Sequence, residues 1–223
     1  MQYSIVKLKT LAASCLFIFF CHICSFAQQQ KHIALQSGDL LFQNLDCGPL
    51  CDAIEEVTNG YNGNKFSHIG LVYIKADTTW IIEAIGKEVH LTPIKEFLQR
   101  SLHAVFIGRV KKQYRSLIPG ALTFALQQTG VPYDDVFLYN NGKYYCSELI
   151  YDAFKCSNHN KPFFQLAPMT FKKPGSKEFN PVWVKYYNKL NAPIPEGMPG
   201  CNPAGLSRSN KIAMIGEERF EKE

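Results

Sequence analysis

Residues 144–154 of the 223-residue chain read YYCSELIYDAF. Apolar side chains in this segment recur at helical spacing, at Leu149, Ile150, Ala153 and Phe154. They predict a helix with one buried face and place Cys146 at or near its N-terminus. The partial positive charge and unpaired N–H groups of a helix N-terminus stabilise a thiolate. Cys146 is therefore a candidate nucleophile, and the alternative is a small, buried apolar side chain.

A β-hairpin is predicted upstream, with strands at residues 68–74 (HIGLVYI) and 80–84 (WIIEA) around a turn at 75–78. A loop of two or four residues pairs His68 with Glu83 or with Ile85, and both registers put His68 and Glu83 on one face. An imidazole can take a thiol proton, and a carboxylate can hold its tautomer. His68 is thus a candidate base and Glu83 its orienting residue. The alternatives are a satisfied core histidine and an edge-strand carboxylate facing water.

The remaining elements mix strands and helices without strict alternation, which favours an α+β fold. Short strands are expected at residues 40–42, 104–110 and 182–187. Helices are expected from Pro49 to about residue 57, from Pro93 with Thr92 as its cap, and over residues 119–129. Residues 191–210 read as an extended loop, and the last ten residues as a charged tail.

The first 27 residues have the pattern of a cleaved secretory signal: Lys7 and Lys9, an apolar run over 11–20, and small residues at Ser25 and Ala27. We therefore expect cleavage near Ala27 and a periplasmic or extracellular protein. The predicted organisation is a signal peptide (1–27), a catalytic domain (28–192), and a C-terminal loop and charged tail (193–223). We expect membrane contact only through the signal segment.

Cleavage at that point would remove two lysines and lower the formal net charge from +5 to +3. No run of Lys and Arg is interleaved with aromatic residues, which argues against nucleic acid as a partner. The five remaining cysteines leave at least one thiol unpaired in an oxidising compartment. A disulfide is the first interpretation of Cys47 and Cys51. The alternatives are a zinc site that includes His68, and a disulfide from Cys47 or Cys51 to Cys156 or Cys201. We predict no cofactor and no metal.

Five segments, taken in order, resemble the YiiX-like permuted papain-type enzymes, relatives of the NlpC-type cell-wall peptidases and of lecithin–retinol acyltransferase. The segments are GDLLF (38–42), FSHIGLV (66–72), IEA (82–84), VPYD (131–134) and YCSELI (145–150). The resemblance covers about residues 36–155. It implies a papain-like fold in circularly permuted order, with an antiparallel sheet or small barrel packed against helices. It also implies Cys146 as nucleophile, His68 as base and Glu83 as the orienting residue.

The function expected from these residues is that of an exported thiol amidase or peptidase, with peptidoglycan fragments as the substrate suggested by analogy. Tyr133, Asp134 and Tyr145 are candidate substrate-binding residues. The alternatives for Tyr133 and Asp134 are a turn with a local acceptor, and the alternative for Tyr145 is simple packing. A long apolar groove beside Cys146 would instead favour an acyltransferase or a lipid ester or amide hydrolase. A buried, inert Cys146 would indicate a non-catalytic binding module.

Overall fold

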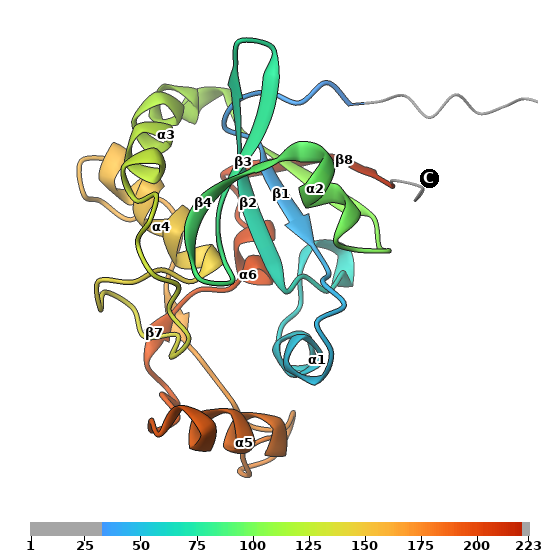
Figure 1. Cartoon of the computed structure of the whole chain (residues 1–223), viewed down its shortest axis with the longest axis vertical. Helices are drawn as coiled ribbons and strands as arrows, with labels where there is room; N and C mark the ends of the chain where they lie inside the picture. Colours follow the sequence, from blue (N-terminus) through green and yellow to red (C-terminus); the bar gives the residue numbers. More distant parts are fainter. Residues whose placement is uncertain (1–32, 220–223) are drawn as a thin grey trace, which may run out of the picture. The chain divides into compact units, whose positions relative to one another are not determined.

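The computed structural model describes residues 33–219, and the predicted signal segment lies outside them. Six antiparallel strands form one sheet in the order β4-β3-β2-β1-β5-β8 (Figure 1). The strands are β1 (Leu40–Gln43), β2 (His68–Lys75), β3 (Thr78–Ile85), β4 (Glu88–Pro93), β5 (Val105–Val110) and β8 (Ile212–Glu218). The sheet is open, so the small-barrel alternative does not hold.

The predicted hairpin is present as β2 and β3, joined by Ala76 and Asp77. Both loop residues have positive φ, 46° and 62°, as a tight two-residue hairpin turn requires. The strands pair from Lys75–Thr78 to Leu71–Ile82. The same register continued to the start of β2 sets His68 opposite Ile85, with Glu83 on the same face and diagonal to it.

Helices cover both faces of the sheet. The helices are α1 (Pro49–Glu56), α2 (Ile94–Gln99), α3 (Ile118–Gln127), α4 (Cys146–Ser157), α5 (Pro181–Leu190) and α6 (Pro203–Ser207), with 3-10 turns at Tyr61–Gly63 and Lys112–Leu117. The main core lies between the sheet and the α3–α4 pair, where Leu149, Ile150 and Phe154 of α4 are fully buried. A second core includes Phe97 of α2 and Val72 of β2. The predicted apolar face of α4 is confirmed.

Residues 182–187 form part of α5 rather than the predicted strand. Asn180 caps this helix by accepting a hydrogen bond from the Val182 amide, and Pro181 occupies its first turn. Trp183 and Tyr187, one helical turn apart, are buried in a third apolar cluster with Phe171. A two-stranded ladder of β6 (Ala167–Pro168) and β7 (Pro199–Gly200) connects this region to the rest of the fold.

Two other local predictions were wrong. The predicted C-terminal loop and tail contain the short helix α6 and the strand β8, which pairs with β5 along the sheet. Thr92 lies in β4, a strand that was not predicted, and its side chain does not cap α2. The domain boundaries themselves stay a prediction. Within the described residues 33–219, no helix is both long and apolar enough to span a membrane.

Candidate functional site

Cys146 is the first residue of α4 and borders a cavity of about 500 Å³. Tyr145 precedes it in an extended conformation, so the thiol stands at the end of the helix where backbone N–H groups have no helical partner. The side chain is mostly buried, with the residue 6% exposed. The predicted position of Cys146 is confirmed, and the thiol can be reached from the cavity.

His68, at the start of β2, interacts with both of the other predicted residues. Its Nε2 lies 2.5 Å from Oε2 of Glu83. Burial alone would lower the pKa of His68, but hydrogen bonds to Cys146 and Glu83, together with their charge, raise it to about 9. The structure therefore brings Cys146, His68 and Glu83 together, although they are far apart in the chain.

Glu83 is completely buried and accepts hydrogen bonds from more residues than sequence reasoning suggested. Thr92 donates its hydroxyl proton to Oε1. Arg100, which follows α2, donates to both oxygens, from Nη1 over 2.8 Å and from Nη2 over 2.6 Å. Burial would raise the pKa of Glu83, but His68 and then Arg100 outweigh it and lower the pKa to about 2. Glu83 is thus an anion held between two cations, and the water-facing alternative is excluded.

A second pair of residues supports the His68 ring from β1 and α2. Gln43 is the direct cross-strand partner of His68, and its side-chain amide donates to the Phe97 carbonyl over 2.7 Å. The Phe97 ring packs against the imidazole with centroids 5.9 Å apart. No local sequence pattern singled out Gln43, Thr92 or Arg100, because each reaches the site through sheet pairing or helix packing.

The three predicted substrate-binding residues fall in different places. Tyr133 and Tyr145 line the cavity. Burial, followed by the charge of Cys146, raises the pKa of Tyr133, so its hydroxyl stays neutral and able to donate. Asp134 lies outside the cavity, fully buried, and accepts from the amides of Val136 and Leu138. The local turn interpretation therefore holds for Asp134.

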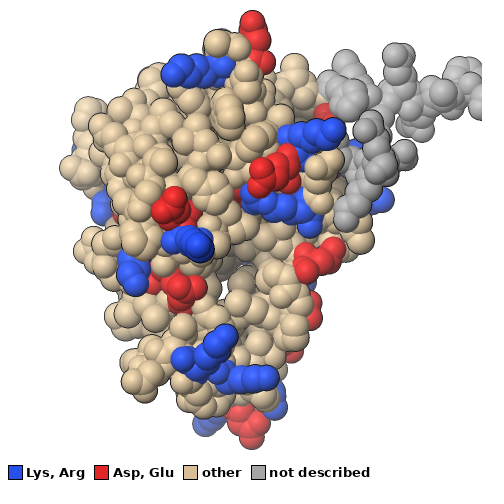
Figure 2. Space-filling model, in the orientation of Figure 1, with Lys and Arg blue, Asp and Glu red and all other residues tan. Residues whose placement is uncertain are grey.

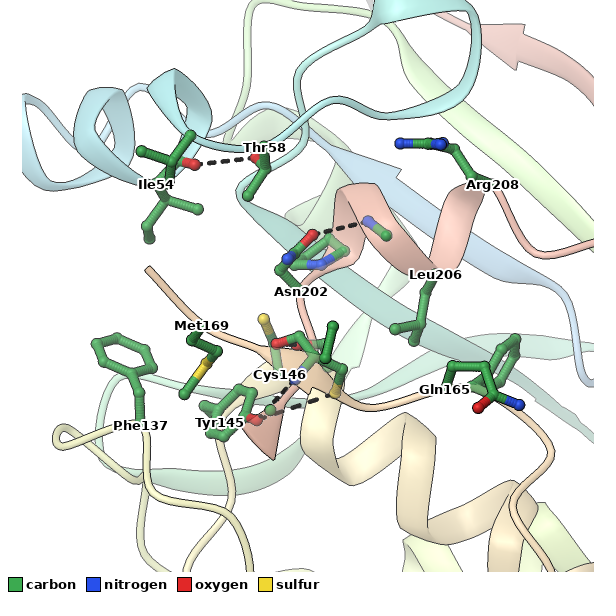
Figure 3. Close-up of a pocket in the computed structure, with 18 of the residues that line it drawn as sticks. Ile54, Thr58, Phe137, Tyr145, Cys146, Gln165, Met169, Asn202, Leu206 and Arg208 are labelled. Atoms are coloured by element: carbon green, nitrogen blue, oxygen red, sulfur yellow. Dashed lines mark hydrogen bonds between the residues drawn. The ribbon is translucent and has the colours of Figure 1, made fainter. Parts of the chain in front are cut away.

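The cavity is lined mainly by apolar side chains from segments far apart in the sequence (Figure 3). Its wall is completed by α1, the segment 163–171, Trp183 of α5, and the segment from β7 to Lys211. Its aromatic and large aliphatic members include Ile54, Phe137, Phe163, Phe164, Met169, Phe171, Trp183 and Leu206. The charged residues among its lining are Arg208 and Lys211, and Lys211 donates to the Phe163 carbonyl. Among the described residues 33–219, no carboxylate lines this cavity.

Among the described residues, two cysteines form a disulfide and three are free thiols. Cys47 and Cys51 are joined, with Cα atoms 5.4 Å apart, because Cys47 precedes α1 instead of lying within a helical turn. This bond rules out the zinc site and the alternative links. Cys156 is a free exposed thiol. Cys201 is buried in the cavity wall, where its amide donates to the Tyr145 hydroxyl over 3.2 Å.

Three comparisons with known proteins identify proteins that this chain resembles. Residues 34–216 match the family model described as permuted papain-like amidase enzyme, YaeF/YiiX, C92 family. The uncharacterized protein YiiX of Escherichia coli K12 is 26% identical over 129 residues, a match that spans 54% of this chain and 57% of that protein. The crystal structure of metalloprotein yiiX from Escherichia coli O157:H7 superimposes with a TM-score of 0.66 at 20% identity, over 83% of this chain and 98% of that one.

The structural likeness establishes the fold, and the family model covers nearly all of the described residues. The mixed helices and antiparallel sheet, with the histidine strand preceding the cysteine helix, are those of a papain-like fold in permuted order. This chain belongs to the permuted papain-like amidase family, YaeF/YiiX, C92.

Proposed function

We propose that this protein is an exported thiol hydrolase that cleaves amides or esters through Cys146, His68 and Glu83. The observation that carries the proposal is the buried imidazole of His68, whose Nε2 lies 2.5 Å from Oε2 of Glu83 and whose pKa is raised by both Cys146 and Glu83. A nucleophile, a base and an orienting group in contact are the arrangement that thiol catalysis requires. Export rests on the predicted signal sequence.

In the proposed reaction, His68 already carries the proton that the thiol of Cys146 gives up, and the sulfur bonds to the substrate carbonyl carbon. The carbonyl electrons move to oxygen, and N–H groups at the start of α4 stabilise the resulting oxyanion. The intermediate collapses when the bond to the leaving group breaks, and His68 protonates that group. Water then attacks the thioester, gives its proton to His68, and releases the acid and the free thiol. Glu83 keeps the imidazole oriented throughout.

The cavity lining bears on the substrate class. A cleft for the amino groups of cell-wall peptides would be expected to present carboxylates, and the described part of the chain places none in this cavity. Apolar side chains instead surround the thiol, which favours an acyl amide or ester with a hydrocarbon chain. The observation supports the lipid-hydrolase or acyltransferase alternative over peptidoglycan fragments as the substrate.

The yiiX protein of Escherichia coli O157:H7 is described as a metalloprotein. Within residues 33–219 of the present chain, no group of three or more His, Cys, Asp or Glu side chains is arranged to hold a metal ion. The side chains in this range therefore do not fit a bound metal, and the proposed steps are assigned to the protein's own residues.

The proposal is tested with the processed protein and its Cys146→Ala form, incubated with long-chain acyl amides, acyl esters and peptidoglycan fragments. We expect turnover of acyl substrates by the native protein only, with a covalent acyl adduct on Cys146 detected by mass spectrometry. Release of acid without transfer to added alcohols or amines would identify a hydrolase, and transfer would identify an acyltransferase. Equal turnover by both forms would refute Cys146 as the nucleophile.

A further inference from the structure

One surface, outside the cavity, combines exposed apolar and basic side chains. We call it the α5 surface and define it as the solvent-facing side of α5 with the loops before and after it, including Lys177, Phe179, Val184, Lys185, Lys189 and Met198. Among the described residues, five large apolar side chains are substantially exposed. Three of the five belong to this surface: Phe179 at 37%, Val184 at 38% and Met198 at 45%. Apolar exposure is thus concentrated here.

The chain segment that contains α5 is basic, although the adjacent α1 contributes Glu56, which accepts a hydrogen bond from Asn180 at the start of α5. Residues 161–200 contain six lysines and two glutamates, a net charge of +4 in a chain whose formal total is +5. Both glutamates are already engaged, Glu178 with Lys173 and Glu196 with Lys172. Two of the six lysines, Lys185 and Lys189, lie on α5 itself. Figure 2 shows basic side chains gathered over the α5 end of the molecule, together with an acidic one.

The helix geometry explains why these groups share a side. Trp183 and Tyr187 point inward at a spacing of four residues. Positions 181, 184, 185, 188 and 189 are exposed and fall on the opposite side of the same helix, at spacings of three and four. That side carries Val184, Lys185 and Lys189 with no acidic residue. It is an amphipathic pattern with lysines beside an apolar group, as in helices that lie on membrane surfaces.

The buried side of α5 belongs to the candidate site. Trp183, together with Phe171, lines the cavity that contains Cys146. The α5 surface is therefore the outer side of a cavity wall. A surface bound by α5 would lie next to the aromatic end of the cavity.

We propose that the α5 surface docks on an anionic lipid bilayer. Lysine ammonium groups would lie among lipid phosphates, while Val184, Phe179 and Met198 enter the interface between headgroups and acyl chains. A bilayer is favoured over an acidic protein partner because the exposed apolar groups are spread along a helix and its loops, and none of the three lines the cavity. The docking stands independently of the thiol chemistry, although it would present the apolar cavity to acyl substrates.

Docking is tested by flotation of the processed Cys146→Ala protein with vesicles of phosphatidylglycerol and phosphatidylcholine, and with phosphatidylcholine alone. We expect binding only to the anionic vesicles, and loss of that binding at high salt. Lys185→Gln with Lys189→Gln should weaken binding roughly 30-fold, at about fivefold for each lysine near the surface. Val184→Asp should weaken it as well, because it places a carboxylate at the interface.

The matched control is Lys75→Gln with Lys95→Gln, which removes two exposed lysines outside the α5 surface and should change binding less than about twofold. Circular dichroism of each variant verifies folding. The proposal would be overturned if the protein bound both vesicle types equally, or if both pairs of lysine substitutions weakened binding equally. It would also be overturned if soluble polyglutamate bound as tightly as the anionic vesicles and the same substitutions weakened that binding as much. If the native protein hydrolysed none of the substrates but still bound anionic vesicles, the proposed function would be refuted and the proposed docking would stand.

Discussion

Arg100 donates one hydrogen bond to each carboxylate oxygen of Glu83, the residue that also contacts His68. Arg100 does not line the cavity, so any effect on a reaction passes through its contacts with Glu83, Thr92 and Phe97. It lowers the pKa of Glu83, second only to His68 in doing so. The candidate site therefore depends on a positioning residue that touches neither thiol nor substrate.

We expect Arg100→Gln to lower kcat between about 10- and 100-fold with little change in KM, because Glu83 would no longer be fixed beneath His68. The free energy of unfolding should fall by about 2–3 kcal/mol, since a buried carboxylate loses two charge-assisted hydrogen bonds. Kinetics and urea denaturation measure the two effects. Arg115→Gln, at an exposed arginine, is the control, and an Arg100→Lys variant should recover part of kcat.

Stability should depend on pH through His68 and Glu83. The folded-state pKa of His68, about 9, lies above its ordinary value of 6.5, so its contribution is complete below pH 6.5 and is lost as the pH rises through 9. The folded-state pKa of Glu83, about 2, lies below 4.5, so its contribution is complete above pH 4.5 and is lost as the pH falls towards 2. Urea denaturation from pH 3 to 10 should show both losses. The alkaline loss should be on the order of 3 kcal/mol and be absent in His68→Gln.

The titration of His68 can be observed directly. The histidine ring signals in NMR should show one imidazole that stays protonated to about pH 9. Glu83→Gln should lower that pKa, because it removes an anion in contact with the ring while preserving its shape. The same variant should lose activity by roughly 10²-fold or more, by analogy with an amide in place of a triad carboxylate. An unchanged pKa in Glu83→Gln would contradict the assigned contact.

The free thiols should differ in reactivity. Burial raises the pKa of Cys201, which keeps that thiol protonated and unreactive. Cys146 lines the cavity next to His68, and Cys156 is exposed. Iodoacetamide at neutral pH should therefore modify Cys146 first, Cys156 more slowly, and Cys201 only after unfolding. Mass spectrometry of peptides from partly labelled protein gives the order. Protection of Cys146 until the protein unfolds would favour the non-catalytic binding module.

The Cys47–Cys51 disulfide closes a very short loop before α1. Replacing both residues with Ser should lower the free energy of unfolding by about 2 kcal/mol, since the stabilisation by a cross-link grows with loop length. The activity should change little because neither residue lines the cavity. Thermal denaturation of this double variant, compared with Cys156→Ser at an exposed thiol, measures the effect. A loss of activity larger than the loss of folded protein would show that α1 depends on the bond.

The parts of the site that could be predicted from sequence rest on local periodicity. The apolar spacing of α4 indicated the position of Cys146, and strand alternation in the hairpin put His68 and Glu83 on one face. The contacts of Arg100 and Thr92 with Glu83 could not be predicted from the sequence, because they depend on how α2 and β4 pack. Sheet pairing likewise brings Gln43 opposite His68, and no short-range pattern reports such a pairing.

The error at α5 has a different origin. Residues 182–187, VWVKYY, are β-branched or aromatic at five of six positions and so favour a strand by propensity. Asn180 followed by Pro181 is a helix-start signal that argues the other way. Burial of Trp183 and Tyr187 at a four-residue spacing then decides in favour of the helix. Tertiary packing overrides propensity here, and the capping residues could have revealed it.

The segment from β7 to β8 follows every other part of the site in the chain, yet it supplies a cavity wall and the strand beside β5. A polypeptide cut short before residue 200 would keep Cys146, His68 and Glu83 but would lack that wall and leave β5 as an unpaired edge. Incomplete products of synthesis would thus carry the reactive group without a compartment to bind substrate. The chain order therefore makes the last segment of the polypeptide a requirement for a complete cavity and a paired β5.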